Sequence, residues 1–353
     1  MGEPQPVITI ELNQQLTPIT LRAPLRMLKG KRLVFEGEAS GPSRRLLVKT
    51  FSSIRHLARE IDGLDLLSSN DIECPTVIFS GQANDLTGFE KFGFRDHQNI
   101  HVLVLEFYPD AENFRTVWHK HITDEYRIHL FTLLFTLIGR QHQAGITQND
   151  LHLGNFLISD DRLISIDGDA IVYNKHLSLE SCYEQLGIIL TQAYPHFDSM
   201  LEKLLPAYFN TRNLPADKQA EKSIFQARAA NREVIKRSKI KKSLRNSTDF
   251  KVEKTFSRHV FINRNFLTEA FDNDLAQLQT SDLTHEWDRD GNRYRAFYYR
   301  WPGFFAKNDA RQQWQDAQVL MADGKEIPPP AALVILTFGP FQRGGYYIEV
   351  IQS

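Results

Sequence analysis

The first hundred residues are dominated by short apolar runs that alternate with polar positions. Residues 17–50 alternate in this way around a turn at Ser40-Gly41-Pro42, which predicts a series of β-strands. Between residues 54 and 68 the apolar positions recur at helical spacing instead, and residues 101–108 (HVLVLEFY) form another strand-like run. The pattern therefore predicts a β-rich segment that contains one helix.

From Thr123 onward the apolar positions follow a longer period. The run IHLFTLLFTLIG is apolar on nearly all sides, which is typical of a buried helix. Thr123 or Asp124 is its predicted cap, and Gly145 its predicted end. Two short strands follow, Phe156–Ile158 and Arg162–Ile166, joined by a Ser-Asp-Asp turn. A β-rich segment followed by a helix-rich one indicates an α+β fold.

The last hundred residues repeat part of this pattern. Residues 310–333 echo residues 58–78, since both open with Ala-Arg, continue as a helix and end in a Pro-bounded strand. A hairpin turn at 290–292 precedes this stretch, and a strand-like run at 344–353 follows it. We therefore predict an incomplete internal repeat over residues 256–353; the alternative is a coincidental succession of helix and strands.

Composition narrows the class of protein. The 353 residues suggest about two domains, and the 42% hydrophobic fraction excludes disorder of the whole chain. The longest apolar run, Ile128–Ile138, is too short to span a membrane, and residues 1–12 lack the features of a secretory signal. Cys74 and Cys182 form neither a CxxC motif nor a disulfide framework. These observations predict a cytoplasmic protein in a reducing compartment.

The net charge of −1 hides one strongly basic segment. Residues 228–245 carry eight Lys and Arg and one Glu. This segment is either a solvated helical connector or a patch for anionic groups, such as phosphates or an anionic membrane face. Few aromatic residues lie among the charges, and the whole chain is not basic, so no nucleic-acid partner is expected.

Three oxygen-bearing side chains are predicted to meet near the hairpin. Asp150 and Asn155 lie five residues apart between the buried helix and the hairpin, and the second strand leads to Asp167. Phosphoryl transfer needs such a set, namely a carboxylate to accept a proton and oxygen ligands for Mg²⁺. The alternative is that these are polar turn residues.

The β-rich segment offers a matching ion pair. Lys49 lies in the predicted strand RLLVKTF, and Glu60 lies in the helix that follows. At about 100° per residue, Glu60 falls inside the apolar arc of that helix, so its carboxylate needs a cationic partner. Lys49 is the predicted partner; the alternative is a Glu60 side chain that bends out to solvent.

Together these features resemble the protein-kinase-like superfamily, and within it the bacterial lipopolysaccharide core kinases, the Kdo/heptose kinase family. The resemblance spans about residues 20–200 and rests on MLKGKRLVFEGE…RLLVKTF, AREIDGLDLL…ECPTVI, HQAGITQNDLHLGNFLI and LISIDGD. The later basic run KRSKIKKSLRNSTDF also looks like the carboxy-terminal part of that family.

The resemblance implies a bilobal α+β fold. The β-rich N-lobe would span residues 1–107, and the helical C-lobe would span 108–255 and end in the basic segment. Residues 256–353 would resemble a degenerate second N-lobe. The implied activity is ATP- and Mg²⁺-dependent phosphorylation of a heptose or Kdo hydroxyl, on a lipopolysaccharide core or lipid A precursor. The implied location is the inner face of the cytoplasmic membrane.

Residue roles follow from the matched motifs. The resemblance makes Asp150 the catalytic base and Asn155 and Asp167 the metal ligands. Lys49 would hold the nucleotide phosphates, and Glu60 would orient Lys49.

The resemblance also implies where the nucleotide would lie. Gly30 would belong to the phosphate-binding turn, although a turn with one glycine is a weak motif. Glu106 and Tyr108, at the end of the strand-like run 101–108, would form the adenine hinge.

Several positions depart from the family pattern. Gln148 stands where a His usually precedes the catalytic Asp, and Gly168-Asp169 stands where Phe-Gly usually follows the metal-binding Asp. His152 has either a structural or a chemical role, and Asp169 is either a metal ligand or a capping residue.

The predicted second N-lobe lacks the ion pair. Gln312 stands at the place of Glu60, and Arg300 or Trp301 at the place of Lys49, so this copy is not expected to bind nucleotide. For the whole chain the alternatives are a pseudokinase that binds partners, or a kinase acting on protein Ser/Thr or another small molecule.

Overall fold

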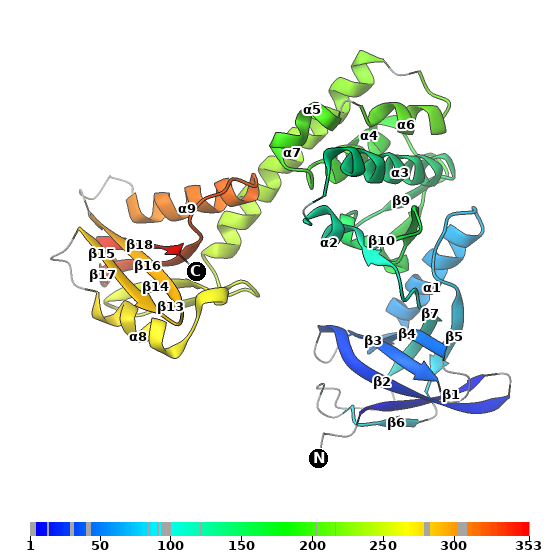
Figure 1. Ribbon diagram of the computed structural model, residues 1–353, viewed down its shortest axis with the longest axis horizontal. Coiled ribbons are helices and arrows are strands. Elements are labelled where there is room, and N and C mark those ends of the chain that lie inside the picture. Colours follow the sequence, from blue (N-terminus) through cyan, green and yellow to red (C-terminus); the bar gives the residue numbers. More distant parts are fainter. Residues whose placement is uncertain are drawn as a thin grey trace. The chain divides into compact units, whose positions relative to one another are not determined.

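The chain forms two compact units, each described here by itself (Figure 1). The first unit comprises Met1–Ala193 and Phe197–Arg228, and the second comprises Tyr194–His196 and Ala229–Ser353. The computed structural model describes residues 5–12, 14–28, 32–39, 44–83, 85–89, 92, 100–120, 122–201, 203–215, 217–278, 283–301 and 309–352. Gly30 and the predicted turn at Ser40-Gly41-Pro42 lie outside the described residues.

The first unit begins with a curled antiparallel sheet in the order β5-β7-β4-β3-β2-β1-β6. Helix α1 (Ile54–Ser68) joins β4 to β5, so the predicted helix is confirmed. The strands are β1 (Val7–Leu12), β2 (Gln15–Leu28), β3 (Arg32–Ala39), β4 (Arg44–Phe51), β5 (Val77–Gln82), β6 (Asp85–Thr87) and β7 (His101–Glu106).

Alternation along β4 decides which side chains face the helix. Leu46 and Val48 belong to one apolar core of the sheet, whereas Phe51 packs with Leu57 and Leu64 of α1 on the other face. Side chains two residues apart share a face of a strand, so Lys49 lies on the same face as Phe51.

Helices and short strands complete the first unit. Helix α3 is buried on several sides, and the Thr123 side chain caps it by accepting from the Tyr126 N–H, as predicted. The predicted hairpin is also present, with Asp160 and Asp161 at positive φ in its turn. The helices are α2 (Phe114–Trp118), α3 (Asp124–Gln143), α4 (Leu179–Leu190), α5 (Asp198–Leu201) and α6 (Leu205–Thr211), with 3₁₀ turns η3 (Leu153–Asn155) and η4 (Gly168–Ala170). Helix α7 (Lys218–Ser243) and the 3₁₀ turn η5 (Pro195–Phe197) each have residues in both units. The short strands are β8 (Glu112–Asn113), β9 (Ile146–Gln148), β10 (Phe156–Ser159), β11 (Arg162–Ser165) and β12 (Ile171–Tyr173).

The second unit is an antiparallel sheet in the order β13-β14-β17-β18-β16-β15, with one helix on each face (Figure 1). Phe271 of α8 packs on one face, and Trp314 of α9 packs on the other. The hairpin predicted at 290–292 is present between β15 and β16. The elements are β13 (Phe250–Lys254), β14 (Arg258–Asn263), η6 (Arg264–Phe266), α8 (Glu269–Gln277), β15 (Thr284–Arg289), β16 (Asn292–Arg300), α9 (Asp309–Ala322), β17 (Pro330–Phe338) and β18 (Phe341–Gln352).

The two sheets share a common arrangement. In the first, β3-β4-β7-β5 are neighbours, and α1 follows β4 in the chain. In the second, β15-β16-β18-β17 are neighbours, and α9 follows β16. Both units therefore contain two strands, a helix and two further strands in the same chain order and the same sheet order.

The units divide at a different place from the predicted domains. The predicted boundary after residue 255 separates β13 from β14, which are paired strands of one sheet. The observed division falls between Arg228 and Ala229, inside α7, and the predicted N- and C-lobes lie together in the first unit. The sequence pattern missed this because β13 is short and follows the charged end of the helix.

The predicted basic segment is not one uniform charged face. Arg228 is 3% exposed and donates to the Leu190 and Ala193 carbonyls, each at 3.2 Å, and to Asp198. Lys236 pairs with Asp323 at 2.9 Å. The exposed basic residues of the segment are Arg237, Lys239, Lys241, Lys242 and Arg245.

Two further observations bear on the class of protein. Among the helices that the structure describes, none combines the length and the apolar character needed to cross a membrane. Cys74 and Cys182 are both free thiols.

Candidate functional site

The structure brings Lys49 and Glu60 together in the interior of the first unit. Lys49 is 7% exposed and Glu60 is fully buried. The Lys49 ammonium donates to Glu60 Oε1 and, at 3.0 Å, to the Ile166 carbonyl oxygen. The lysine is therefore held between α1 and the chain that leaves β11. Removing one partner of such a buried ion pair strongly destabilises the folded protein, because the other charge is left buried and unpaired.

A glycine–glycine contact fixes the helix that carries Glu60. A Cβ atom added at Gly63 would lie 2.0 Å from the Gly168 carbonyl oxygen, and one added at Gly168 would lie 2.1 Å from the Glu60 carbonyl oxygen. The Gly168 N–H also donates to Glu60 Oε1 at 3.3 Å. Helix α1 thus packs backbone against backbone on η4, which explains why a bulky residue is absent after Asp167.

The Asp169 carboxylate forms ion pairs with basic side chains from two elements. Its carboxylate pairs with Arg32 of β3 and Arg59 of α1, each at 2.8 Å, and lies 3.3 Å from His56 Nδ1. Of the two roles considered for Asp169, neither a cap nor a metal ligand describes this geometry. Asp169 instead links the sheet, α1 and η4.

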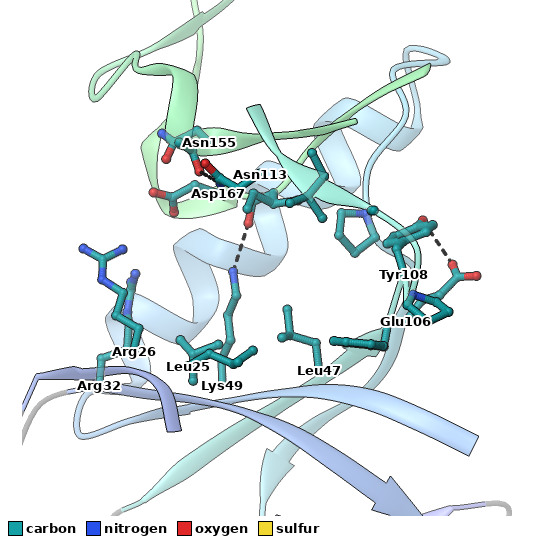
Figure 2. A pocket seen from close by; sticks show the side chains of 18 of the residues that line it. Leu25, Arg26, Arg32, Leu47, Lys49, Glu106, Tyr108, Asn113, Asn155 and Asp167 are labelled. Carbon is teal, nitrogen blue, oxygen red and sulfur yellow. Dashed lines mark hydrogen bonds between the residues drawn. The ribbon is translucent and has the colours of Figure 1, made fainter. Parts of the chain in front are cut away.

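Asp167 and Asn155 lie side by side at the cleft (Figure 2). Burial and the Glu60 carboxylate raise the pKa of Asp167, against the opposing effect of Lys49 and Arg32. Asp167 Oδ1 is buried and has no hydrogen-bond partner within the described ranges. The Asn155 amide nitrogen donates to the Asp150 carbonyl at 2.7 Å, a bond that does not use its amide oxygen.

These oxygens fit Mg²⁺. A buried carboxylate oxygen without a donor and a nearby amide oxygen are hard ligands of the kind this ion prefers. In the part of the chain that the structure describes, no group of three His, Cys, Asp or Glu side chains could hold a metal ion. The protein would therefore supply few ligands, as is usual for Mg²⁺ bound together with phosphates and water.

Asp150 lies apart from the cleft wall. Its side chain is 75% exposed, and Oδ2 is 3.6 Å from His152 Nε2. His152 lines the cleft, and burial lowers its pKa despite the nearby Asp150 carboxylate. The imidazole is therefore mostly neutral at pH 7. It lies beside Asp150 as a polar neighbour rather than as a fixed cation.

Glutamine side chains that the sequence analysis did not predict hold the loop that carries Asp150. Gln192 accepts from the Leu153 N–H at 2.9 Å and donates to the Leu151 carbonyl at 3.2 Å. Gln185 donates to the Gln148 carbonyl at 2.8 Å. Glutamine belongs to no catalytic motif, and these contacts join positions about forty residues apart, so no signal in the sequence marked them.

Gln148, the first departure from the family pattern, is part of the same network. It is 2% exposed, and its amide nitrogen donates to Gln141 Oε1 at 3.1 Å. Its side chain is therefore a buried structural group behind the loop, which does not face the cleft.

The cleft itself has a volume of about 530 Å³ and lies between the sheet and the helical part of the first unit (Figure 2). Glu106 and Tyr108 lie at one end, and Arg26 and Arg32 at the other, with Lys49 between them. Its apolar lining is made of Leu25, Val34, Leu47, Pro75, Phe107, Leu157 and Ile166. A planar apolar group would fit the first end and an anionic group the second.

The predicted hinge residues use their side chains internally. Glu106 Oε2 accepts from Thr76 Oγ1 at 2.9 Å and from the Tyr108 hydroxyl at 3.3 Å. Burial and the Glu106 carboxylate raise the pKa of Tyr108 to about 12. Any hydrogen bonds from this segment to a ligand would therefore come from its backbone.

Arg26 was not among the site residues predicted from the sequence. This residue lies near the end of β2, lines the cleft, and extends alongside Arg32 (Figure 2). Arg32 is held by Asp169. Arg26 therefore adds positive charge at the end of the cleft opposite Glu106 and Tyr108, beyond Lys49.

The sequence matches no protein-family model, and a search of curated proteins found no match.

Proposed function

We propose that the first unit is a kinase that transfers the γ-phosphoryl group of ATP, with Mg²⁺, to a sugar hydroxyl. The observation that carries the proposal is the buried Lys49–Glu60 pair, whose lysine lines a single cleft together with Asp167 and Asn155. The alternative of a Glu60 side chain that bends out to solvent does not account for a carboxylate that is fully buried and bonded to Lys49. The cleft volume of about 530 Å³ is in the range of small-ligand sites.

The finer parts of the proposal rest on the sequence resemblance. We infer a bilobal protein-kinase-like fold for the first unit, and a heptose or Kdo hydroxyl of the lipopolysaccharide inner core as acceptor. The strand order β2-β3-β4-β7-β5, with α1 between β4 and β5, supports the N-lobe part of this inference. The acceptor is supported by the sequence resemblance alone, which includes the motif HQAGITQNDLHLGNFLI.

Each residue of the candidate site has a separate role in the proposed phosphoryl transfer. The apolar lining near Phe107 would hold the adenine, and Lys49 would neutralise the phosphates in an orientation fixed by Glu60. Asp150 would take the proton of the acceptor hydroxyl while the oxygen of that hydroxyl bonds to the γ-phosphorus. The bond from that phosphorus to the bridging oxygen breaks, and ADP leaves. Asn155 and Asp167 are the residues that would hold Mg²⁺, which when bound neutralises charge on the phosphates.

Asp150→Asn tests the proposed base. We expect phosphoryl transfer to fall about 10²–10³-fold, because a general base contributes on this order. The affinity for Mg-ATP should stay unchanged, since Asp150 does not line the cleft. Turnover by the purified full chain and binding measured by thermal shift check the two expectations.

The outcomes separate the alternatives. A wild-type chain that shows no shift with Mg-ATP contradicts the kinase proposal. A chain that binds Mg-ATP without turnover is a pseudokinase, and one in which Asp150→Asn is fully active has its base elsewhere. Loss of core-oligosaccharide phosphate from cells that lack the gene tests the acceptor.

Arg26→Ala tests the phosphate end of the cleft. We expect the KM for ATP to rise roughly 5–10-fold with kcat little changed, because a partly solvated cation on a phosphate contributes a modest, uniform binding energy. Arg22→Ala is the matched control, since Arg22 lies on the same strand and pairs with Glu36 and Glu38. Equal KM values for the two variants would place the phosphates away from Arg26.

We infer that the second unit is related to a kinase N-lobe without the ion pair. The shared chain and sheet order supports a repeat. Gln312 donates to Asp316 on its own helix at 2.9 Å, and Arg300 is exposed at the end of β16. This unit would serve for docking rather than for nucleotide binding.

A further inference from the structure

Exposed aromatic side chains gather at one end of the second unit's sheet. Phe256, Phe338 and Phe341 are 66%, 62% and 50% exposed, respectively. Phe256 lies in the turn between β13 and β14, and the other two flank the turn between β17 and β18. The Phe256 and Phe338 rings meet edge to face, with centroids 5.3 Å apart. We call these three residues the phenylalanine tip.

The two turns that carry the tip are joined by backbone hydrogen bonds. The Phe256 carbonyl accepts from Thr337 Oγ1 at 2.8 Å and from the Gly339 N–H at 3.2 Å. The Thr337 N–H donates to the Ser257 carbonyl at 2.8 Å. The two hydrogen-bonded turns therefore hold the exposed rings in place. This lowers the conformational entropy that the protein loses when the rings bind a partner.

Basic residues lie next to both turns of the tip in the chain. Lys254 and Arg258 flank the first turn, and Arg343 follows the second. Glu253, the acidic residue nearest to the first turn in the chain, pairs with Lys251 at 2.7 Å. Three cations and three aromatic rings therefore share one end of the sheet.

We propose that the phenylalanine tip inserts into the headgroup region of an anionic bilayer. Apolar rings that project from turns, with cations around them, match a surface whose interior is apolar and whose face is negative. The cores of protein–protein interfaces are depleted of charged residues such as lysine, whereas here Lys254 and Arg258 flank the turn that carries Phe256. The proposal concerns the second unit alone and does not depend on the kinase assignment. It places the membrane contact on the tip, whereas the sequence analysis considered residues 228–245.

The test is sedimentation of the full chain with vesicles. We expect binding to vesicles of phosphatidylglycerol and phosphatidylcholine in equal parts, and little binding to phosphatidylcholine alone. The double substitution Phe256→Ser, Phe338→Ser should weaken the apparent affinity about tenfold or more, because it removes two apolar groups from the interface. Met321→Ser is the matched control, since Met321 is 42% exposed in the same unit and lies near the end of α9, before β17 begins, whereas the tip lies where β17 ends.

A second pair of variants tells the tip from the basic helix. Lys254→Glu with Arg258→Glu should reduce binding, whereas Lys239→Glu with Lys241→Glu should leave most of it. Melting temperatures confirm that each variant is folded. A wild-type chain that does not sediment with anionic vesicles overturns the proposal. Unchanged binding of the double Phe variant, or loss only with the Lys239 and Lys241 variant, overturns it equally.

Discussion

Alanine at Gly63 is expected to lower the melting temperature of the first unit by roughly 4–12 °C, from a loss of about 2–3 kcal/mol. Helix propensity alone predicts the opposite, since alanine is favoured over glycine within a helix by about 1 kcal/mol. The added Cβ would lie 2.0 Å from the Gly168 carbonyl oxygen, so α1 must move away from η4. Because Glu60 lies on the same helix, that movement should also weaken its bond to Lys49 and with it the binding of Mg-ATP.

The sign of the change makes this a sharp test. Asp62→Ala, at the exposed neighbouring position of α1, is the control and should change the melting temperature little. Gly168→Ala approaches the same contact from the other side and should destabilise the unit as well. If Gly63→Ala were more stable than wild type, the close approach of α1 and η4 would be wrong.

Asp167→Asn is expected to abolish most turnover and yet to raise the stability of the ligand-free protein. We expect the proposed phosphoryl transfer to fall on the order of 10³-fold, because the substitution removes a carboxylate that we propose as a ligand of Mg²⁺. The melting temperature should rise by roughly 1–3 °C, since the substitution removes a buried charge beside Glu60. Turnover assays and calorimetry on the same preparations measure both effects.

The gain in stability should depend on pH. Burial and Glu60 raise the pKa of Asp167 in the folded chain, so its ionised form opposes folding. The advantage of Asp167→Asn is therefore full above the raised folded pKa. This stability advantage becomes smaller as the pH falls from the raised pKa of folded Asp167 toward the ordinary pKa of an aspartate. Asp161→Asn, at an exposed hairpin turn, is the control and should change neither turnover nor stability. A destabilised Asp167→Asn at pH 8 would contradict the electrostatic argument.

The helices and strands could be predicted where their apolar residues recur at regular spacing. Helix α1 and the β10–β11 hairpin occur at the predicted positions. The approach of Lys49 to Glu60 could also be anticipated, since a glutamate within an apolar arc requires a cation. These inferences needed only the spacing of residues within about twenty positions of one another.

The rest of the site depends on contacts between distant segments. Gln192 reaches back to residues 151 and 153, and the Arg228 guanidinium is held by carbonyls of residues 190 and 193. Neither residue type signals such a role in the sequence, because an exposed glutamine or arginine would look the same. The phenylalanine tip could not be predicted for a related reason. Whether a phenylalanine ring is exposed depends on which other residues the fold places next to it.

The contact between Gly63 and Gly168 also bears on how this protein could be controlled. Many two-state proteins are switched by sliding one packed element over another, which requires side chains that can exchange positions. Here the helix that bears Glu60 rests on bare backbone, and Asp169 ties it to β3 as well. We expect the lysine–glutamate pair to be assembled constitutively, so that the rate of the proposed phosphoryl transfer would follow the supply of nucleotide and acceptor.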